Sequence, residues 1–291
     1  MFTSEDYYKD ADSGLKNQLK RFDLMNVQQT VHIDNTKISY YEVTNEKPVL
    51  LMLPGATGKG ISLFRIAQQL QDEFHIFMLD YPDIDELDSA ALAIIKMMKD
   101  RGIERFNVLA HSYGSFLLQG ILKHEPKMVN KLVTINGYSK YYMGFFALRT
   151  ERKNLQRFLK FINYVPFNRY QDRYASKTRV AIDIYKENKP YQKFWKGFYE
   201  ELLMISDKEE TITNYRMMLD YWKEFVGPIT FDDFEGEALC ITTKGGNVKG
   251  KEGLISSFNK VEEKRIDKSS SLALVEFAGD IVQSTKNFLR E

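Results

Sequence analysis

Four apolar segments constrain the fold of this chain of 291 residues more than any other feature. Each of them is followed by a short loop and then by an amphipathic or apolar helical segment. Each is a near-continuous run of branched, methionine or aromatic residues, typical of strands buried on both faces of a parallel sheet. The alternation predicts an α/β fold, a doubly wound and mostly parallel sheet with helices on both faces. The four segments are "PVLLMLPG", "FHIFMLDYP", "RFNVLAH" and "KLVTING".

The two ends of the chain complete the expected core. A polar helix is expected over about residues 4–21, and then an antiparallel pair, "VQQTVHID" and "KISYYEV", that turns at Asp34 and Asn35. Near the end of the chain, "GEALCITTKGG" and "SLALVEF" are expected strands, the second being the last of the sheet. A short helix, "IVQSTKNFLRE", follows them.

Between these parts, residues 138–227 contain only helical patterns. We interpret this block as a cap inserted into a core made of residues 1–137 and 228–291. Most of its many aromatic residues are expected to pack the helices against the core. Some of them would line a hydrophobic acyl or aromatic substrate pocket.

Charge divides the expected cap into two halves. Residues 140–199 carry fourteen Lys or Arg against four Asp or Glu, whereas residues 200–237 carry three against eleven. In one interpretation the halves pair with each other or are solvated faces. In the other, a basic and aromatic lid contacts an anionic lipid head group, a coenzyme phosphate or a membrane surface.

Composition excludes several classes of protein. A net charge of +1 gives no argument for a nucleic-acid partner, and the single cysteine, Cys240, excludes an internal disulfide. No signal-like or membrane-spanning run is present, so we expect a soluble, cytoplasmic protein. No metal-ligand spacing occurs, and Gly55 and Gly60 lack the lysine of a phosphate-binding loop, since Ile61 follows them. We therefore expect no metal and no cofactor, and a small hydrophobic molecule as substrate or ligand.

The segment "AHSYGS", residues 110–115, is the main candidate for chemistry. It follows an expected buried strand and opens an expected helix. A serine at such a sharp turn requires small residues two positions before and after it, because larger side chains would collide with the neighbouring backbone. Ala110 and Gly114 meet this requirement on the two sides of Ser112.

This segment resembles the nucleophile elbow of the α/β-hydrolase superfamily, with alanine in place of its first glycine. The resemblance extends over about residues 28–137 and implies that Ser112 is a nucleophile. It also implies that the backbone N–H groups of Ala56 and Tyr113 stabilise an oxyanion. Gly55, His111 and Gly114 would then border the substrate pocket.

The sequence departs from the superfamily in two places near these residues. Pro54 and Gly55 stand where the superfamily often has His-Gly. After the strand "FHIFMLDYP", the chain enters a helix directly instead of passing through the usual D-x-x-G-x-G-x-S.

The acid and the base of the expected triad are missing. In the superfamily, the chain order is serine, acid and histidine. Gly246 or Asn247 occupies the acid's place, with Glu252, Asp232 and Asp233 as nearby alternatives. Asp280 occupies the place of the histidine.

None of the four histidines, His32, His75, His111 and His124, follows residue 124. The ring of His111 is expected to point away from the serine, and the other three are expected to be structural. Asp280, if burial raised its pKa, and a cap lysine with a depressed pKa remain the alternative bases.

Two functional hypotheses follow from these residues. One is a serine hydrolase that acts on ester, thioester or amide bonds of a hydrophobic or acyl substrate. The other is a catalytically inactive hydrolase-fold protein that binds a hydrophobic anionic ligand or a protein partner.

Overall fold

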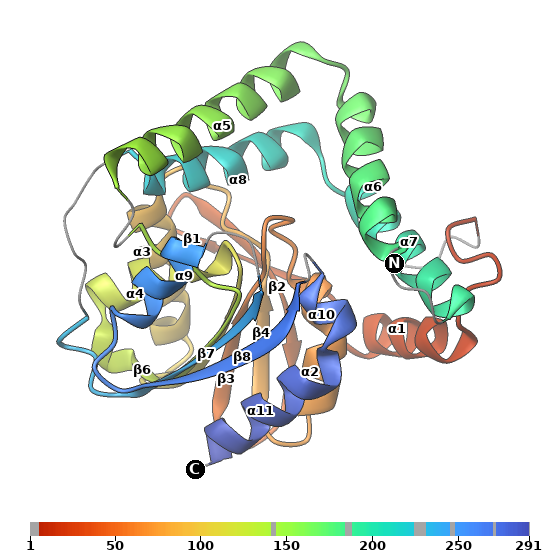
Figure 1. Ribbon diagram of the computed structural model, residues 1–291. Coiled ribbons are helices and arrows are strands. Elements are labelled where there is room, and N and C mark those ends of the chain that lie inside the picture. The colour runs from red at the N-terminus through yellow and green to blue at the C-terminus, as the bar shows by residue number, and fades with distance from the viewer. Residues whose placement is uncertain are drawn as a thin grey trace.

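An eight-stranded sheet forms the centre of the molecule in the computed structural model (Figure 1). The structure describes residues 6–140, 144–183, 188–223, 231–244, 248–269 and 272–290. The strand order is β1-β2-β4-β3-β5-β6-β7-β8, and β2 is antiparallel to both of its neighbours while the remaining pairs are parallel. The strands are β1 (Gln29–Ile33), β2 (Thr36–Val43), β3 (Val49–Leu53), β4 (His75–Leu79), β5 (Phe106–His111), β6 (Val129–Ile135), β7 (Glu237–Lys244) and β8 (Val261–Ser269).

Helices cover both faces of this sheet, which confirms the predicted doubly wound α/β class. One face packs against α1 (Ser13–Met25), α2 (Phe64–Leu70), α10 (Ala273–Glu276) and α11 (Ala278–Arg290). The other packs against α3 (Leu87–Asp100), α4 (Gly114–His124) and α9 (Val248–Ile255). Two short 3₁₀ turns, η1 (Gly60–Leu63) and η2 (Pro126–Met128), precede α2 and β6.

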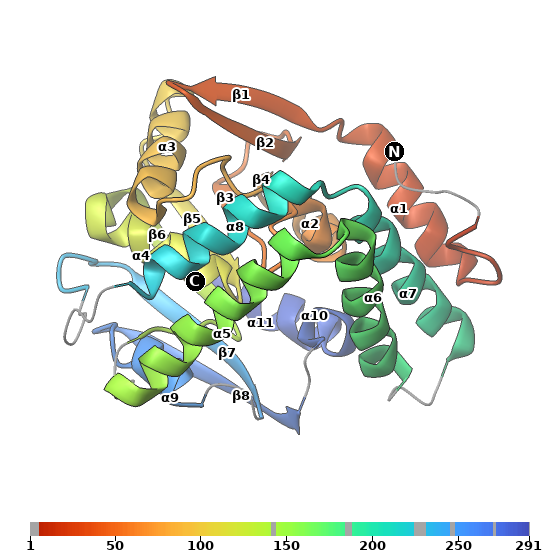
Figure 2. The ribbon, with the colours of Figure 1, turned by 90° about the horizontal axis from the view of Figure 1, so that it is seen from above.

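Four helices between β6 and β7 cross above the carboxyl ends of the strands (Figures 1 and 2). They are α5 (Phe145–Tyr164), α6 (Phe167–Asp183), α7 (Lys189–Met204) and α8 (Lys208–Tyr221). We call them the cap, and all four lie within the range 138–227 that the sequence assigns to it. No helix in the part of the chain that the structure describes is long and apolar enough to cross a membrane.

The aromatic residues of α7 have the packing role that the sequence predicted for most of the cap's rings. Phe194, Trp195 and Phe198 are almost completely buried. Their ring centroids lie 5.3 to 6.3 Å from that of Phe64 on α2. These rings therefore join the cap to the core.

The first helix begins later than expected. The sequence predicts it over about residues 4–21, but α1 starts at Ser13, and residues 6–12 form turns and irregular chain. The Asp12 carboxylate accepts a hydrogen bond of 2.8 Å from the N–H of Leu15, which caps the helix at this point.

The prediction of the last strand was wrong. The strand at this end of the sheet is β8, whose sequence "VEEKRIDKS" is mostly charged and exposed, whereas "SLALVEF" contains the short helix α10. A short apolar run does not distinguish a buried strand from a buried helix, and an edge strand can hold its place through backbone hydrogen bonds to β7 alone. Asp280 therefore lies on α11, beyond α10, and does not directly follow the last strand.

Candidate active site

Ser112 lies at the turn between β5 and α4, in a backbone conformation that non-glycine residues rarely adopt. Its φ is 50°, in the left-handed region. The N–H of Ser112 donates to the carbonyl of Ile135 on β6 over 2.8 Å, and the Ser115 hydroxyl donates to the carbonyl of Ser112 over 2.7 Å. Two neighbouring elements thus hold the strained residue in place.

The requirement for small residues around Ser112 has a direct structural cause. A Cβ on Gly114 would lie 2.6 Å from the carbonyl oxygens of both Leu53 and Pro54, well inside van der Waals contact. Ala110, on the other side, is fully buried in β5 between β3 and β6. The start of α4 therefore touches the end of β3, and this contact brings the loop after β3 up to the serine.

That loop contains Gly55 and Ala56, the residues that the resemblance places in an oxyanion hole. A Cβ on Gly55 would lie 3.6 Å from the Cβ of Ser112, so the loop passes directly beside the nucleophile candidate. Within the described chain, the N–H groups of Ala56 and Tyr113 donate no hydrogen bond. Both N–H groups therefore lack a partner among the described residues.

The residues that fix this loop come from the end of β4 and were missed by the sequence analysis. The Tyr81 hydroxyl donates to the carbonyl of Pro54 over 2.9 Å, and the Tyr81 N–H donates to the carbonyl of Gly58 over 2.8 Å. The Asp80 carboxylate accepts the N–H of Gly60 over 2.9 Å. The sequence signal that could have pointed to them is "DYP", residues 80–82, which stands where the superfamily usually has D-x-x-G-x-G-x-S.

Lys59 connects the same loop to the cap. Its ammonium lies 3.2 Å from the Asp80 carboxylate and also pairs with Glu210 on α8. Burial raises the pKa of Asp80 and of Glu210, and Lys59 opposes both shifts. Burial alone would lower the pKa of Lys59, but the two carboxylates outweigh it and raise that pKa.

His111 lies next to Ser112 in the chain, but its ring is directed at Gly55. Its Nδ1 is 2.8 Å from the position that a Cβ on Gly55 would take, so the ring lies against the glycine. No hydrogen bond joins it to the Ser112 hydroxyl. Burial lowers the pKa of His111 to about 4, so the imidazole is neutral at neutral pH.

The other three histidines also have different neighbours. His75 Nε2 lies 2.8 Å from the Glu42 carboxylate, His124 Nε2 lies 3.3 Å from that of Asp88, and His32 is on β1 near the edge of the sheet. None of the three hydrogen-bonds to Ser112.

The candidate acids do not meet Ser112 either. Asp280 is exposed in the first turn of α11, and Glu252 on α9 is also exposed. Asp232 and Asp233 are exposed before β7. Gly246 and Asn247, at the expected place of the acid, lie outside the described residues. Among the described residues, therefore, no side chain forms a hydrogen bond with the Ser112 hydroxyl.

Tyrosines surround the space between the elbow and the cap. The hydroxyls of Tyr113 and Tyr138 are hydrogen-bonded to each other, and burial raises the pKa of both. A cavity of about 20 Å³ lies between Ala56 on the loop and cap residues that include Tyr174 and Tyr215. It has room for about one water molecule.

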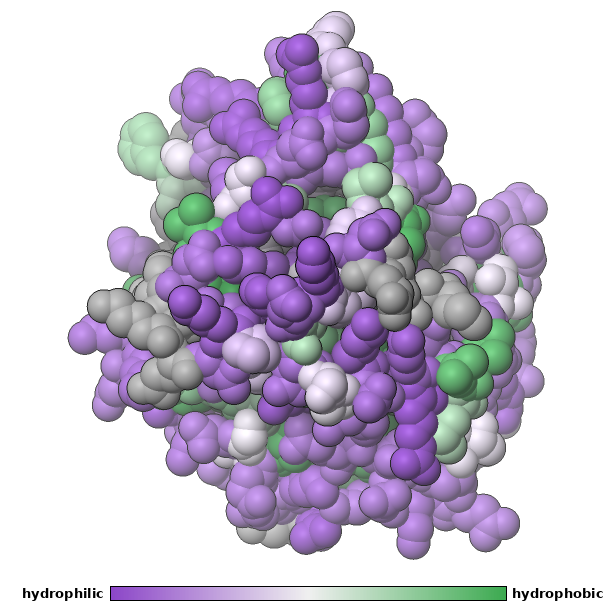
Figure 3. All heavy atoms as spheres, turned by 90° about the vertical axis from the view of Figure 1, so that its right-hand side faces the viewer, coloured by the Kyte–Doolittle hydropathy of each residue, from purple (hydrophilic) through white to green (hydrophobic). Residues whose placement is uncertain are grey.

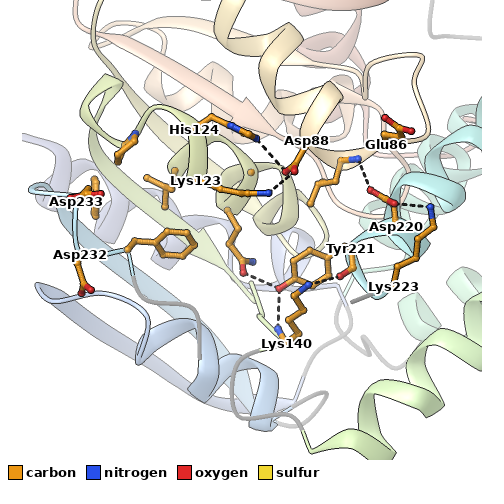
Figure 4. A pocket seen from close by; sticks show the side chains of 17 residues that line it. Glu86, Asp88, Lys123, His124, Lys140, Asp220, Tyr221, Lys223, Asp232 and Asp233 are labelled. Carbon is orange, nitrogen blue, oxygen red and sulfur yellow. Dashed lines mark hydrogen bonds and ion pairs between the residues drawn. The ribbon is translucent and has the colours of Figure 1, made fainter. Parts of the chain in front are cut away.

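A much larger hollow, of about 800 Å³, lies away from the serine beside α3, α4 and α8 (Figure 4). Residues of both charge signs line it. The Tyr221 hydroxyl donates to the amide oxygen of Gln119 over 2.8 Å, and Gln119 donates to the carbonyl of Ser115 over 2.8 Å. The hollow thus lies behind α4, and neither Ser112 nor the loop at Gly55 lines it.

Solved structures with a similar arrangement belong to one fold. A hydrolase from Pseudomonas aeruginosa matches with a TM-score of 0.71 at 13% identity, over 90% of this chain and 98% of its own. An enol-lactonase from Burkholderia xenovorans matches with a TM-score of 0.67 at 12% identity, over 90% of this chain and 100% of its own. A protein described as a putative lipase from Acinetobacter baumannii matches with 0.68 at 12% identity, over 96% of both chains.

No protein-family model matches the sequence. The structural matches nevertheless cover nearly the whole chain, with TM-scores of 0.67 to 0.71. This protein has the α/β-hydrolase fold, with a helical cap.

Proposed function

We propose that this protein is a serine hydrolase in which Ser112 attacks an ester, thioester or amide bond of a hydrophobic or acyl substrate. The observation that carries the proposal is the left-handed conformation of Ser112, with its φ of 50°. Such a conformation costs about 1–3 kcal/mol and is retained chiefly where it serves a function. A serine that only capped α4 would not need it.

The free N–H groups of Ala56 and Tyr113 support the same proposal. As the Ser112 oxygen bonds to the substrate's carbonyl carbon, negative charge develops on the carbonyl oxygen, and two fixed donors would stabilise it. The leaving group departs when the carbonyl re-forms, and the proton of the serine hydroxyl ends on that group. Loss of one such donor typically costs about a hundredfold or more in rate.

One observation favours the second candidate, a hydrolase-fold protein that binds a hydrophobic anionic ligand or a protein partner without catalysis. Within the described chain, no imidazole or carboxylate hydrogen-bonds to the Ser112 hydroxyl. A serine without its base keeps only the part of the rate enhancement that comes from the oxyanion donors and from binding, roughly 10³–10⁴ over water. The two candidates therefore differ in whether Ser112 is activated.

A fluorophosphonate probe, read by intact mass, tests this difference. Wild-type protein should take up one probe molecule, Ser112→Ala should take up none, and Ser176→Ala should be labelled like wild type because Ser176 is exposed on α6. If folded wild-type protein takes up no probe over hours, Ser112 is not activated and the ligand-binding candidate replaces the hydrolase.

A further inference from the structure

The outer side of α5 carries a stripe of basic and aromatic residues. Exposed residues recur three or four positions apart, which places them on one side of a helix. They are Phe146, Arg149, Lys153, Arg157, Lys160 and Tyr164. Phe146, which is 80% exposed, and Tyr164, which is 86% exposed, lie at the two ends of the stripe, which is about 27 Å long.

The opposite side of the same helix is the one that packs on the protein. Leu148, Leu155, Leu159 and Ile162 are buried there. Because the buried residues and the stripe lie on opposite sides of α5, the stripe points away from the core. Seen from above, α5 lies uppermost over the sheet, beside α6 and α8 (Figure 2).

Acidic residues of the cap do not neutralise this charge. Of the ion pairs between described residues, only Arg179–Glu200 joins the basic half of the cap to its acidic half. Glu210 in the acidic half pairs with Lys59 of the core instead. Between the residues that the structure describes, one ion pair therefore joins the two halves of the cap.

The helix next to α5 extends the basic surface. On α6, Arg169, Arg173 and Lys177 are exposed at helical spacing and form no ion pair with any described residue. The side of the molecule over α6, α7 and α1 is mostly hydrophilic (Figure 3). Two adjacent helices therefore present positive charge on the outside of the cap.

We propose that the outer stripe of α5 binds the surface of an anionic lipid membrane. The cations would meet lipid phosphates, and the two end rings would lie among the head groups, where amphipathic rings are favoured. The exposed rings and the outward-facing position on a single helix favour a flat lipid surface over nucleic acid, whose phosphates require charge but no rings at the two ends. This inference goes beyond the proposed hydrolase and does not depend on Ser112 being reactive.

Vesicle flotation with phosphatidylcholine, with and without phosphatidylglycerol, provides the test. The triple variant K153Q/R157Q/K160Q removes three charges from the stripe. Its matched control, K47Q/R105Q/K127Q, removes two lysines and one arginine from the segments just before β3, β5 and β6, at the amino ends of these strands. All six side chains are exposed and form no ion pair within the described chain.

We expect wild type and control to float with vesicles that contain phosphatidylglycerol and not with vesicles of phosphatidylcholine only. Each cation near an anionic surface contributes about fivefold in binding, so the stripe variant should bind about a hundredfold more weakly. Phe146→Ser combined with Tyr164→Ser should weaken flotation while leaving retention on double-stranded DNA unchanged. Equal binding by the stripe variant and the control would overturn the proposal, and so would wild-type binding to DNA without binding to the vesicles.

Because the readout is vesicle binding, Ser112→Ala should float like wild type. If wild-type protein is labelled by the probe but does not float, the membrane-binding proposal is rejected and the proposed hydrolase is not. If it floats but is not labelled, the proposed hydrolase is rejected and the membrane-binding proposal is not.

Discussion

Replacing Lys59 with methionine should destabilise the protein more than any other single loss of a positive charge described above. The Lys59 side chain is 12% exposed, and those of Asp80 and Glu210 are 4% and 24% exposed. Methionine keeps the length of the side chain but leaves two carboxylates without their shared cation. Breaking a buried ion pair from one side costs about 3–5 kcal/mol.

We expect the lower end of that range, about 3 kcal/mol, because Glu210 is partly reached by water. With an unfolding entropy of about 2.1 cal/mol/K per residue, this loss lowers Tm by about 5 °C. Urea unfolding followed by circular dichroism measures the free energy directly. The matched control is Lys96→Met, which breaks the exposed pair with Asp34 and should change stability far less, because water screens exposed ion pairs.

The destabilisation should also depend on pH in a defined direction. Burial raises the pKa of Asp80 and Glu210 from 3.8 and 4.5, and Lys59 opposes this rise. Without Lys59 the pKa values of both carboxyls rise further in the folded protein. The same carboxyls then ionise at lower pH in the unfolded chain than in the folded one. The folded variant therefore loses stability as pH increases, so the difference from wild type should grow as pH rises above 3.8 and 4.5, the ordinary pKa values of the two carboxyls.

A second substitution separates the charge effect from loss of packing. In K59M/E210Q, the uncompensated charge on α8 is absent, so the double variant should be more stable than the sum of the two single changes predicts. If Lys59→Met costs no more than Lys96→Met at every pH, the buried network does not hold the cap to the loop at Gly55, and the reasoning is refuted.

Gly114→Ala should lower the free energy of unfolding by about 1–3 kcal/mol and abolish probe labelling of Ser112, because its Cβ would meet two carbonyl oxygens at 2.6 Å. Gly279→Ala has open space around the new Cβ and lies in a helix, so urea unfolding should show a gain of about 0.5–1 kcal/mol. Asp280→Asn should leave the labelling rate unchanged, since the carboxylate is exposed on α11, and a large loss of rate would restore Asp280 as a base. His111 should titrate at about 4 by NMR, and stability should fall as pH drops from 6.5 toward that value, because only the unfolded chain takes up the proton there; His111→Gln should remove this dependence.

The sequence alone determined most of the sheet and the position of the sharp turn at Ser112. Apolar runs such as Val49–Leu53 could be assigned to strands covered on both faces because they alternate with helical segments along the chain. This turn was also visible, because "AHSYGS" combines a strand end, a serine and a glycine within a few residues. These are local patterns, and backbone geometry imposes them at short range.

Other features depend on contacts between residues far apart in the chain. The charged strand β8 is a strand only because β7 offers it a partner, and "SLALVEF" is helical there although its apolar residues fit either structure. The ion pair from Lys59 to Glu210 spans 151 residues, and Tyr81 reaches back 27 residues to Pro54. Spacing along the chain contains no information about such pairs.

The sequence thus determined that a serine would stand at a strained turn with a glycine-containing loop nearby, because steric limits on the backbone act within a few residues. Only the tertiary structure decided which groups hold that loop, where the four histidines lie, and which side of α5 faces outward. Those outcomes depend on how helices and strands pack in three dimensions, where burial and pairing of distant charges outweigh local preference.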